Sequence, residues 1–365
     1  MSPLAVVYMT VVWIRNWLYD ISVFRVHEFA IPVISVGNIT VGGTGKTPHV
    51  EYLVRLLKDK YGVAVLSRGY KRRTRGFVVA DQHSTVDDLG DEPWQIHRKF
   101  PEIKVIVDAD RVRALRKIEE EMPDVQVVIL DDAFQHRSVK AGLSILLIEY
   151  DFPLSREFYL PAGRMRESPH EKKRADIVLF TKCPEKLKPI EERIRVKHFH
   201  PFPYQQVYFT RIVYGNPVPL FPEEEPEVLT AEKLREKKIN IISVTGIANP
   251  TPFYKYLQGF TDKLTTLSFP DHHRFGKKDM NRIRGLLAEK PAEKNIILTT
   301  EKDAVRIAAL PAELVPARQS WYYIPVEVAV LRGSEQKDLE DKILEYVGNN
   351  QRNRQIHQGQ GPGNA

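Results

Sequence analysis

The segment Ile34–Pro48 constrains the fold more than any other part of this chain, because it joins an apolar run to a glycine-rich turn and a lysine. The β-branched run Ile31–Val36 predicts a buried strand, and Val50–Lys58 predicts a helix. Glycines between them allow backbone N–H groups to point at a phosphate, which the positive N-terminal end of the helix also attracts. The sequence therefore predicts a phosphate-binding loop and a bound nucleotide.

The loop departs from the usual pattern at one position. That pattern, G-x-x-x-x-G-K-[ST], has a glycine where this chain has Thr40, so we expect the later glycines to carry the turn. Lys46 is predicted to reach the β- and γ-phosphates, and the Thr47 hydroxyl to ligate Mg²⁺. The alternative is a glycine-rich turn with an incidental Gly-Lys-Thr. The predicted ATP-binding residues are Thr40, Val41, Gly42, Gly43, Thr44, Gly45, Lys46 and Thr47.

Composition narrows the class of protein. A single cysteine, Cys183, excludes an intrachain disulfide framework and is typical of a reducing, cytoplasmic compartment. The net charge of +7 indicates an anionic partner such as phosphate, nucleic acid or an acidic membrane surface. No motif supports the nucleic-acid interpretation, so we expect no nucleic-acid partner.

The N-terminal segment is apolar but short. Its run Leu4–Ile14 falls below the roughly 20 residues that a membrane-spanning helix needs, and it lacks the features of a secretory signal. Apolar residues recur at helical spacing (Leu4, Val7, Tyr8, Val11, Ile14, Leu18 and Ile21). Two interpretations stay open. The helix lies at a lipid–water interface, with Trp13 and Trp17 at the boundary, or it is buried against the core.

Apolar runs and amphipathic stretches alternate along the rest of the chain. Strands are predicted at 62–67, 104–107, 125–130, 144–148 and 177–180, with a helix at 111–121. This order predicts an α/β fold, a P-loop NTPase-like parallel sheet flanked by helices, with a second, smaller α/β lobe joined by an extended hinge. The expected divisions are an N-terminal interfacial helix (1–28), a core domain (29–204), a hinge (205–226), a C-terminal lobe (227–348) and a disordered tail (349–365).

Two acidic residues follow the buried strand at 125–130. Asp131 and Asp132 stand in the Walker-B arrangement, where a carboxylate holds Mg²⁺ directly or through water. The alternative is an ordinary turn after a strand. Gln135 and His136 come next and are candidates to orient the site.

A kinase that phosphorylates an alcohol needs a base near the γ-phosphate. Asp91 is one candidate, and its alternative role is a helix N-cap. The other is Asp271-His272-His273, whose histidines could equally be surface or core residues. No Cys/His spacing indicates zinc. The loop that contains Arg164, Arg166 and Glu167 is a further candidate, since arginines in a Pro/Gly loop grip phosphate well; a solvated basic loop is the alternative.

The ordered motifs of the chain resemble those of one family. They are Val36-Gly-Asn-Ile-Thr-Val-Gly-Gly-Thr-Gly-Lys-Thr-Pro48, Ser67-Arg-Gly-Tyr70, Leu89-Gly-Asp-Glu-Pro93, Asp131-Asp-Ala-Phe-Gln-His136, Pro161-Ala-Gly-Arg-Met-Arg-Glu167, Phe269-Pro-Asp-His-His273 and Thr300-Glu-Lys-Asp-Ala-Val305. Together they resemble tetraacyldisaccharide 4′-kinase, the lipid A 4′-kinase of Gram-negative envelope biosynthesis. The resemblance runs from about Arg15 to about Val347.

The resemblance implies transfer of the γ-phosphate of ATP, with Mg²⁺, to the 4′-hydroxyl of tetraacyldisaccharide 1-phosphate, giving lipid IVA. It implies that Asp91 is the catalytic aspartate and His272 its partner. It also implies a peripheral or monotopic protein, expected to be a monomer, on the cytoplasmic face of the inner membrane, bound to its anionic surface. The residues that would serve Mg²⁺ are Thr47, Asp131, Asp132 and Glu167, and those that would contact substrate or phosphate are Arg68, Gln135, His136, Arg164 and Arg166.

Two residues depart from the family pattern, Ala133 in place of glycine and Ser168 in place of proline. A positive φ at Ala133 would cost about 1–2 kcal/mol.

Other classes of protein remain as hypotheses. A P-loop GTPase would read guanine with Thr-Lys-x-Asp, but Pro184 replaces that aspartate after Thr181-Lys182. A metallochaperone should show Cys/His spacing, which is absent. A membrane-associated ATPase or nucleotide sensor is a further hypothesis. Unlike a kinase, such a protein would not phosphorylate a lipid acceptor.

Overall fold

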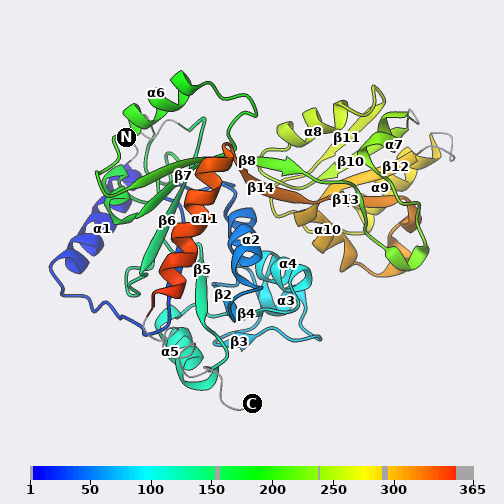
Figure 1. Cartoon of the computed structure of the whole chain (residues 1–365). Coiled ribbons are helices and arrows are strands. Elements are labelled where there is room, and N and C mark those ends of the chain that lie inside the picture. Colours follow the sequence, from blue (N-terminus) through cyan, green and yellow to red (C-terminus); the bar gives the residue numbers. More distant parts are fainter. Residues whose placement is uncertain (1–2, 153–156, 237–238, 290–294, 351–365) are drawn as a thin grey trace, which may run out of the picture. The chain divides into compact units, whose positions relative to one another are not determined.

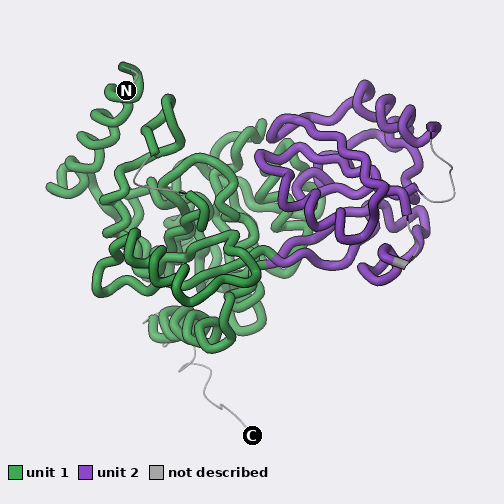
Figure 2. The backbone as a smooth tube through the Cα atoms, turned by 90° about the horizontal axis from the view of Figure 1, so that it is seen from above, with its two compact units in different colours: residues 1–212, 328–365 green, residues 213–327 purple. Residues whose placement is uncertain are grey.

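The computed structural model describes residues 3–152, 157–236, 239–289 and 295–350. The chain divides into two compact units, coloured separately in Figure 2. Unit 1 comprises residues 1–212 and 328–365, and unit 2 comprises residues 213–327. Unit 2 is therefore an insertion between two segments of unit 1.

A nine-stranded sheet forms the centre of unit 1 (Figure 1), in the order β14-β8-β7-β6-β1-β5-β2-β4-β3. Pairs from β8 to β4 are parallel, and β3 pairs antiparallel with β4. From the central strand β1 the chain turns to one side through β2 and later to the other through β6, an arrangement that places ligands beyond the strands' carboxyl ends. The strands are β1 (Val33–Gly37), β2 (Val63–Ser67), β3 (Val78–Val79), β4 (Lys104–Val107), β5 (Val127–Asp131), β6 (Leu143–Glu149), β7 (Ile177–Thr181), β8 (Gln206–Tyr214) and β14 (Val326–Val330).

Helices cover both faces of this sheet, because its strands are buried on both sides. In β1, Ile34 and Val36 join the cluster beneath α2, α4 and α11, whereas Val33 joins the cluster beneath α5. The helices of unit 1 are α1 (Pro3–Asp20), α2 (Lys46–Leu57), α3 (Val86–Leu89), α4 (Asp91–Lys99), α5 (Arg111–Glu121), α6 (Pro189–Phe199) and α11 (Gly333–Gly348), with a 3₁₀ helix at Pro169–Arg174. The predicted fold class, a parallel P-loop sheet flanked by helices, is confirmed.

Unit 2 has a five-stranded sheet of its own, in the order β11-β10-β12-β13-β9, with only β9 antiparallel to its neighbour. One apolar cluster lies under α9 and α10, and another under α7 and α8. The strands are β9 (Val218–Pro219), β10 (Asn240–Thr245), β11 (Leu264–Ser268), β12 (Asn295–Thr300) and β13 (Trp321–Ile324). The helices are α7 (Ala231–Glu236), α8 (Thr251–Gln258), α9 (Lys277–Ala288) and α10 (Glu301–Ala308), with 3₁₀ turns at Pro222–Glu224, Ala312–Leu314 and Arg318–Ser320.

The units divide the chain differently from the predicted boundaries. Strand β8, within the expected hinge, pairs in parallel with β7 of the large sheet. Strand β14 and helix α11, expected in the C-terminal lobe, belong largely to unit 1. Leu339, Ile343 and Val347 of α11 are fully or almost fully buried in the same cluster as α2, which accounts for this placement. The predicted tail at 349–365 lies, apart from residues 349 and 350, outside the described residues.

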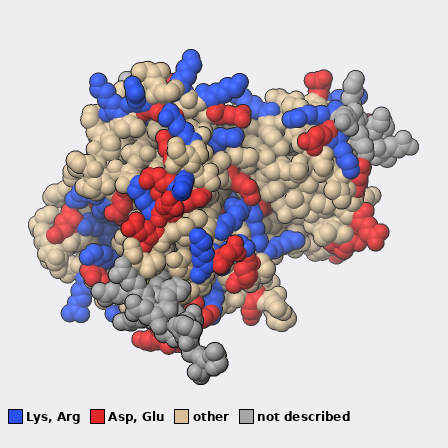
Figure 3. All heavy atoms as spheres, in the orientation of Figure 1, with Lys and Arg blue, Asp and Glu red and all other residues tan. Residues whose placement is uncertain are grey.

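Charged side chains of both signs are interspersed over the face seen in Figure 3. The net charge of +7 is therefore not gathered into one patch on that face. Along the described residues, the structure has no helix that is both long enough and apolar enough to cross a membrane.

Candidate active site

The predicted phosphate loop joins β1 to α2. Gly42 and Gly45 have φ values of 114° and 87°, which favour glycine, and Gly45 is the N-cap of α2. A Cβ atom at Gly42 or Gly43 would meet open space, as expected of a loop that leaves room for a ligand. Helix α2 begins at Lys46, four residues before the predicted start, since Pro48 is tolerated in a first turn. Thr47 is its second residue.

Side-chain hydrogen bonds hold the loop in shape. Asn38 Nδ2 donates to Thr44 Oγ1 over 2.9 Å, and Thr181 Oγ1 donates to the Thr44 carbonyl over 2.9 Å. His49 of α2 lies under the loop with Nδ1 2.7 Å from the Gly45 carbonyl oxygen and Nε2 2.9 Å from Thr210 Oγ1. Burial lowers the pKa of His49 to about 4, so the ring is neutral.

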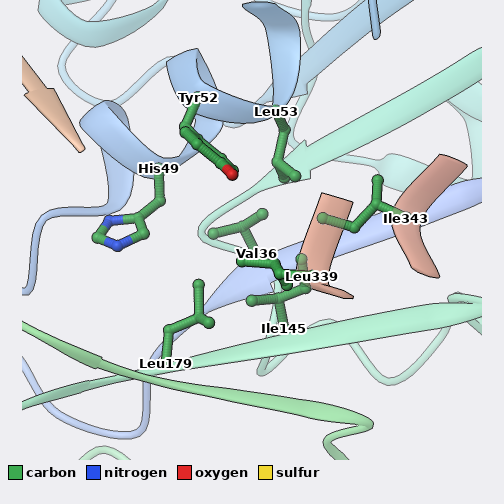
Figure 4. A pocket seen from close by; sticks show the side chains of 8 residues that line it. All are labelled: Val36, His49, Tyr52, Leu53, Ile145, Leu179, Leu339 and Ile343. Atoms are coloured by element: carbon green, nitrogen blue, oxygen red, sulfur yellow. The ribbon is translucent and has the colours of Figure 1, made fainter. Parts of the chain in front are cut away.

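A small cavity lies beside His49, between α2, the sheet and α11 (Figure 4). Figure 4 shows Tyr52 and Leu53 of α2 above Val36, with Leu339 and Ile343 of α11 to one side. The volume of this cavity is about 10 Å³, which is room for no more than one water molecule. This cavity is a packing defect rather than a ligand site.

The predicted Pro/Gly loop lies against the phosphate loop. The Val41 N–H donates to the Arg164 carbonyl over 2.7 Å, and the Arg166 N–H donates to the Ile39 carbonyl over 2.9 Å. The Arg164 guanidinium stacks on Phe152, with its carbon 4.1 Å from the ring centre. The Arg166 guanidinium instead bonds to Asp132, at 2.8 and 3.0 Å from the two carboxylate oxygens.

Lys46 and Asp132 are also close, with Nζ 3.7 Å from Oδ1. Burial by itself would raise the pKa of Asp132, but Lys46 and Arg166 outweigh it and hold that pKa below its ordinary value. Asp132 has a φ of 49°, whereas Ala133 is not among the residues with positive φ. The strain expected of a positive φ at Ala133 is therefore absent, because the left-handed residue is Asp132 instead.

Asp131 lies at the end of β5, paired in register with Val36 of β1. Its side chain is buried; Oδ2 accepts a hydrogen bond from Ser67 Oγ at 3.2 Å, and Oδ1 has no partner among the described residues. Burial, followed by the charges of Glu92 and Asp132, raises the pKa of Asp131 to about 7. A buried carboxylate oxygen without a partner is a suitable ligand for a cation.

Asp91 is the first residue of α4, and the N-cap is Gly90. Gly90 has a φ of 90°, and a Cβ there would lie 2.7 Å from the Tyr70 carbonyl oxygen. A Cβ at Gly69, with a φ of 68°, would lie 2.9 Å from the Leu89 carbonyl oxygen. The two glycines thus allow the predicted motifs at 67–70 and 89–93 to pack backbone against backbone, which fixes the start of α4.

One functional candidate was missed from the sequence. Arg111, at the start of α5, is 1% exposed. Its Nη1 donates to the Asp108 carbonyl, while Nε and Nη2 have no partner in the described part of the chain. Burial lowers the pKa of Arg111 to about 10, and the charge of Asp131 opposes that shift. The signal was Asp108-Ala-Asp-Arg111, a polar run just after a predicted strand.

His136 lies near this arginine. Burial, followed by the charges of Arg111 and Arg68, lowers the pKa of His136 to about 4. A neutral imidazole and two cations therefore gather near Asp131 and Asp132 at the carboxyl end of the sheet.

The carboxylate of Glu167 is buried and lies among residues from several segments. It accepts hydrogen bonds from Asn16 Nδ2 at 3.3 Å and from Gln135 Nε2 at 3.4 Å, and it pairs with Arg174. Further bonds run from Tyr8 to the Arg166 carbonyl and from Arg15 to the Gln135 carbonyl. Helix α1 is thereby joined directly to the candidate site.

The predicted metal ligands do not form a compact set. Within residues 3–152, 157–236, 239–289 and 295–350, no group of three or more His, Cys, Asp or Glu side chains is placed to hold a metal ion. Among the residues that the structure describes, Asp131 offers an oxygen without a partner, whereas Asp132 is paired with Lys46 and Arg166.

His272 lies in unit 2 with a φ of 58°. Its Nδ1 is 3.0 Å from Arg306 Nη2, and its Nε2 is 3.1 Å from Lys302 Nζ. His273 faces a different set of residues, with Nε2 3.0 Å from Asp279 and its ring stacked on Phe269. These contacts give the two adjacent histidines different environments.

Comparison with known proteins gives a consistent result. The family model described as tetraacyldisaccharide-1-P 4′-kinase matches residues 1–347. A tetraacyldisaccharide 4′-kinase of Bacteroides thetaiotaomicron is 45% identical over 358 residues, covering 96% of this chain and 93% of that protein. One of Phocaeicola vulgatus is 46% identical over 353 residues, covering 96% and 95%. The crystal structure of the "apo" form of LpxK from Aquifex aeolicus in complex with ATP is 29% identical, covers 93% of this chain and 97% of that one, and has a TM-score of 0.69.

Proposed function

The chain belongs to the tetraacyldisaccharide-1-P 4′-kinase family, and we propose that the residues around Lys46, Asp91 and Asp131 carry out its phosphoryl transfer. The protein is an ATP-dependent kinase that transfers the γ-phosphate of ATP to the 4′-hydroxyl of tetraacyldisaccharide 1-phosphate, a step of lipid A biosynthesis. The observation that carries the assignment of the site is the glycine loop at 42–45, with Lys46 at its end and the buried Asp131 on the neighbouring strand.

ATP binding is assigned to the loop between β1 and α2. Its positive-φ glycines and the N-terminal end of α2 offer backbone N–H groups and a positive dipole to the phosphates. Lys46 now lies between the loop and Asp132, and we expect it to exchange that ion pair for the phosphate oxygens. Arg166 stays with Asp132, so the carboxylate keeps a cationic partner when Lys46 leaves.

The donor set near the loop fits Mg²⁺. Asp131 contributes an oxygen without a partner among the described residues, Asp132 follows it directly in the chain, and the Thr47 hydroxyl follows Lys46 at the end of the phosphate loop. When bound, Mg²⁺ would neutralise negative charge on the phosphate oxygens. Glu167, which faces Arg174 and helix α1, is then assigned the task of holding Gln135 and Asn16 in place.

Asp91 is assigned as the base. As the 4′-oxygen bonds to the γ-phosphorus, the bond from that phosphorus to the bridging oxygen of ADP breaks, and the hydroxyl proton passes to the Asp91 carboxylate. Gly69 and Gly90 keep the start of α4 fixed, so the carboxylate is positioned by backbone packing. His272 of unit 2 is the partner of Asp91 in this proposal.

Helix α1 is proposed to lie on the anionic surface of the inner membrane, on its cytoplasmic face. Its exposed residues include large apolar side chains, among them Leu4, Val7, Val11, Trp13 and Trp17, each between 48% and 67% exposed. Such a stripe favours an interfacial location, which suits a substrate whose acyl chains stay in the bilayer. The sequence left a buried helix as the alternative, and only Ala5 and Asn16 of α1 are buried.

The test is transfer of ³²P from [γ-³²P]ATP to tetraacyldisaccharide 1-phosphate in detergent micelles. Wild type is expected to label the lipid, and Lys46→Ala and Asp91→Asn to lose at least about 100-fold in kcat. Asp87→Asn, an exposed aspartate of the neighbouring helix α3, is the control for Asp91 and should keep wild-type rates. Full activity of Asp91→Asn would remove Asp91 from the mechanism. Absence of labelled lipid with wild type would contradict the lipid kinase itself.

A further inference from the structure

The motif Thr300–Val305 and the arginine that follows it have no assigned task in the reaction. Residues 301–306 belong to helix α10 of unit 2, and Thr300 caps that helix by accepting from the Asp303 N–H. All of the contacts described below lie within unit 2.

Asp303 is the centre of a buried network. Its Oδ2 accepts hydrogen bonds from the Gly246 N–H at 2.8 Å and from Thr300 Oγ1 at 2.7 Å, and its Oδ1 accepts from Arg306 Nη1 at 3.0 Å. The Asp303 side chain is fully buried. A Cβ at Gly246 would lie 3.0 Å from Asp303 Oδ1, so glycine at the end of β10 permits this close approach.

Arg306 is locked by that network. Its side chain is 7% exposed, and Nη1 also lies 3.4 Å from the Gly246 carbonyl oxygen. The same carbonyl accepts the His272 N–H at 3.2 Å. Backbone and side-chain bonds thus set both the position of Arg306 and that of the left-handed residue His272.

The contact between Arg306 and His272 dictates where the imidazole proton resides. A guanidinium has only N–H donors, so the Nδ1 atom that faces it at 3.0 Å must offer its lone pair. A neutral imidazole has one such lone pair, and Nε2 then carries the proton.

Lys302 does not alter this conclusion. Its ammonium lies 3.1 Å from His272 Nε2, so a protonated Nε2 would face the N–H donors of the lysine. Its Nζ also lies 3.6 Å from Asp271 Oδ1, and its side chain is 25% exposed. Of the two cations beside His272, the buried and doubly bonded Arg306 is fixed, whereas Lys302 has a second partner and solvent to move toward.

We propose that Arg306, held by Asp303, is a positioning residue that fixes His272 as the Nε2–H tautomer, so that His272 acts as a hydrogen-bond donor in the reaction. This rests on the proposed role of His272 as the partner of Asp91. It divides the work of that pair: Asp91 accepts the substrate proton, and the imidazole donates from Nε2 without itself gaining a proton.

The tautomer is measured directly with ring-¹⁵N histidine in the full chain, with the His272 signals identified by their loss in His272→Gln. Wild type is expected to show a pyridine-type Nδ1 and a pyrrole-type Nε2. Arg306→Met should give a mixture or the opposite tautomer, because the donor to Nδ1 is lost while the Lys302 ammonium still faces Nε2. Arg306→Lys should restore the wild-type pattern. A protonated Nδ1 in wild type, or no change in Arg306→Met, would overturn the proposal.

Kinetics give a second readout. Arg306→Met should lower kcat for lipid phosphorylation by about 10- to 100-fold with KM for ATP within about twofold of wild type, and Arg306→Lys should recover most of kcat. Arg284→Met, an exposed arginine of α9 in the same unit, is the control and should match wild type. Loss of kcat and ATP affinity together, without rescue by lysine, would indicate a structural role only. Inactive wild type would contradict the proposed function, while the ¹⁵N signals would still decide the tautomer.

Discussion

The carboxyl groups of Asp131 and Asp132 lie in opposite environments although the residues are adjacent in the chain. Asp132 bonds to Arg166 at 2.8 Å, whereas Asp131 is 1% exposed and accepts one hydrogen bond, from Ser67. The pKa of Asp132 is accordingly lowered, and that of Asp131 is raised to about 7. The Asp132 carboxylate therefore binds cationic side chains of the protein itself, whereas the Asp131 carboxylate is left for a cation from outside.

Stability should respond to the raised pKa of Asp131, which is about 7 in the folded state. The aspartate of the unfolded chain titrates near 4, so the native state binds more protons than the unfolded state between about pH 4 and 7. The protonated Asp131 therefore contributes to the free energy of unfolding at low pH, and this contribution is lost as pH rises through 7. The histidines His49 and His136, with pKa near 4, act in the opposite direction below about pH 6.5. Asp131→Asn therefore isolates the effect. Without Mg²⁺, its unfolding free energy relative to wild type should rise by about 2–4 kcal/mol from pH 5 to pH 8.

Urea unfolding at several pH values measures this difference, with the exposed Asp87→Asn as the control. A constant difference across the range would mean that the Asp131 carboxyl has an ordinary pKa.

Gly90→Ala should damage both stability and activity. The φ of 90° and the Tyr70 carbonyl 2.7 Å from the added Cβ force the start of α4 to shift, at a cost of about 1–3 kcal/mol, and Asp91 shifts with it. Gly285→Ala, in the interior of α9 where a Cβ meets open space, should instead stabilise by about 0.5–1 kcal/mol. Denaturant unfolding and kcat are the measurements. A Gly90→Ala enzyme with normal kcat would show that the position of Asp91 tolerates movement.

Arg111 and Arg113 of the same helix should respond in opposite ways. Arg111→Met removes a buried cation, two of whose nitrogens have no partner among the described residues, so stability should hold or rise by about 1 kcal/mol while kcat/KM falls at least about 10-fold. Arg113→Met leaves the buried carboxylate of Asp108 without the 2.6 and 2.9 Å bonds of Arg113, and should cost about 1–3 kcal/mol of stability. Thermal unfolding and steady-state kinetics compare the two. Equal losses of stability would indicate that Arg111 is a structural residue.

Removing the apolar stripe of α1 should weaken membrane binding. The double variant Val7→Ser and Trp13→Ser deletes two side chains that are 61% and 63% exposed, and binding to phosphatidylglycerol vesicles should fall by about 10-fold or more. Val228→Ser, which removes a 70% exposed valine of unit 2, is the matched control. Vesicle co-sedimentation reports the change. Undiminished binding would favour a different membrane-facing surface.

Local sequence signals predicted local structure well. The strand at 104–107 and the helix at 111–121 match β4 and α5 residue for residue, because apolar runs and helical periodicity are sufficient there. The phosphate loop was equally accessible, since glycine spacing and the lysine lie within one short segment. Helix α2 begins four residues before the predicted start, because its first turn accommodates Pro48.

Long-range packing was beyond the reach of the same reasoning. Nothing local indicates that α11 covers α2, or that Asn16 would bond to Glu167, 151 residues away. The sequence did not predict a functional role for Arg111, because an arginine at the start of a charged helix is ordinarily exposed. Only the folded structure shows that Arg111 is buried.

The insertion of unit 2 has a consequence for the order of synthesis. Helix α11 covers the same cluster as α2, with Tyr52 bonded to Glu340, yet it leaves the ribosome some 280 residues after α2. Unit 2 is complete by residue 327, so it is translated in full before unit 1 has all of its strands. The nucleotide loop therefore gains its last supporting helix only at the end of translation. A chain that stalls early carries the glycine loop without the packing that holds it.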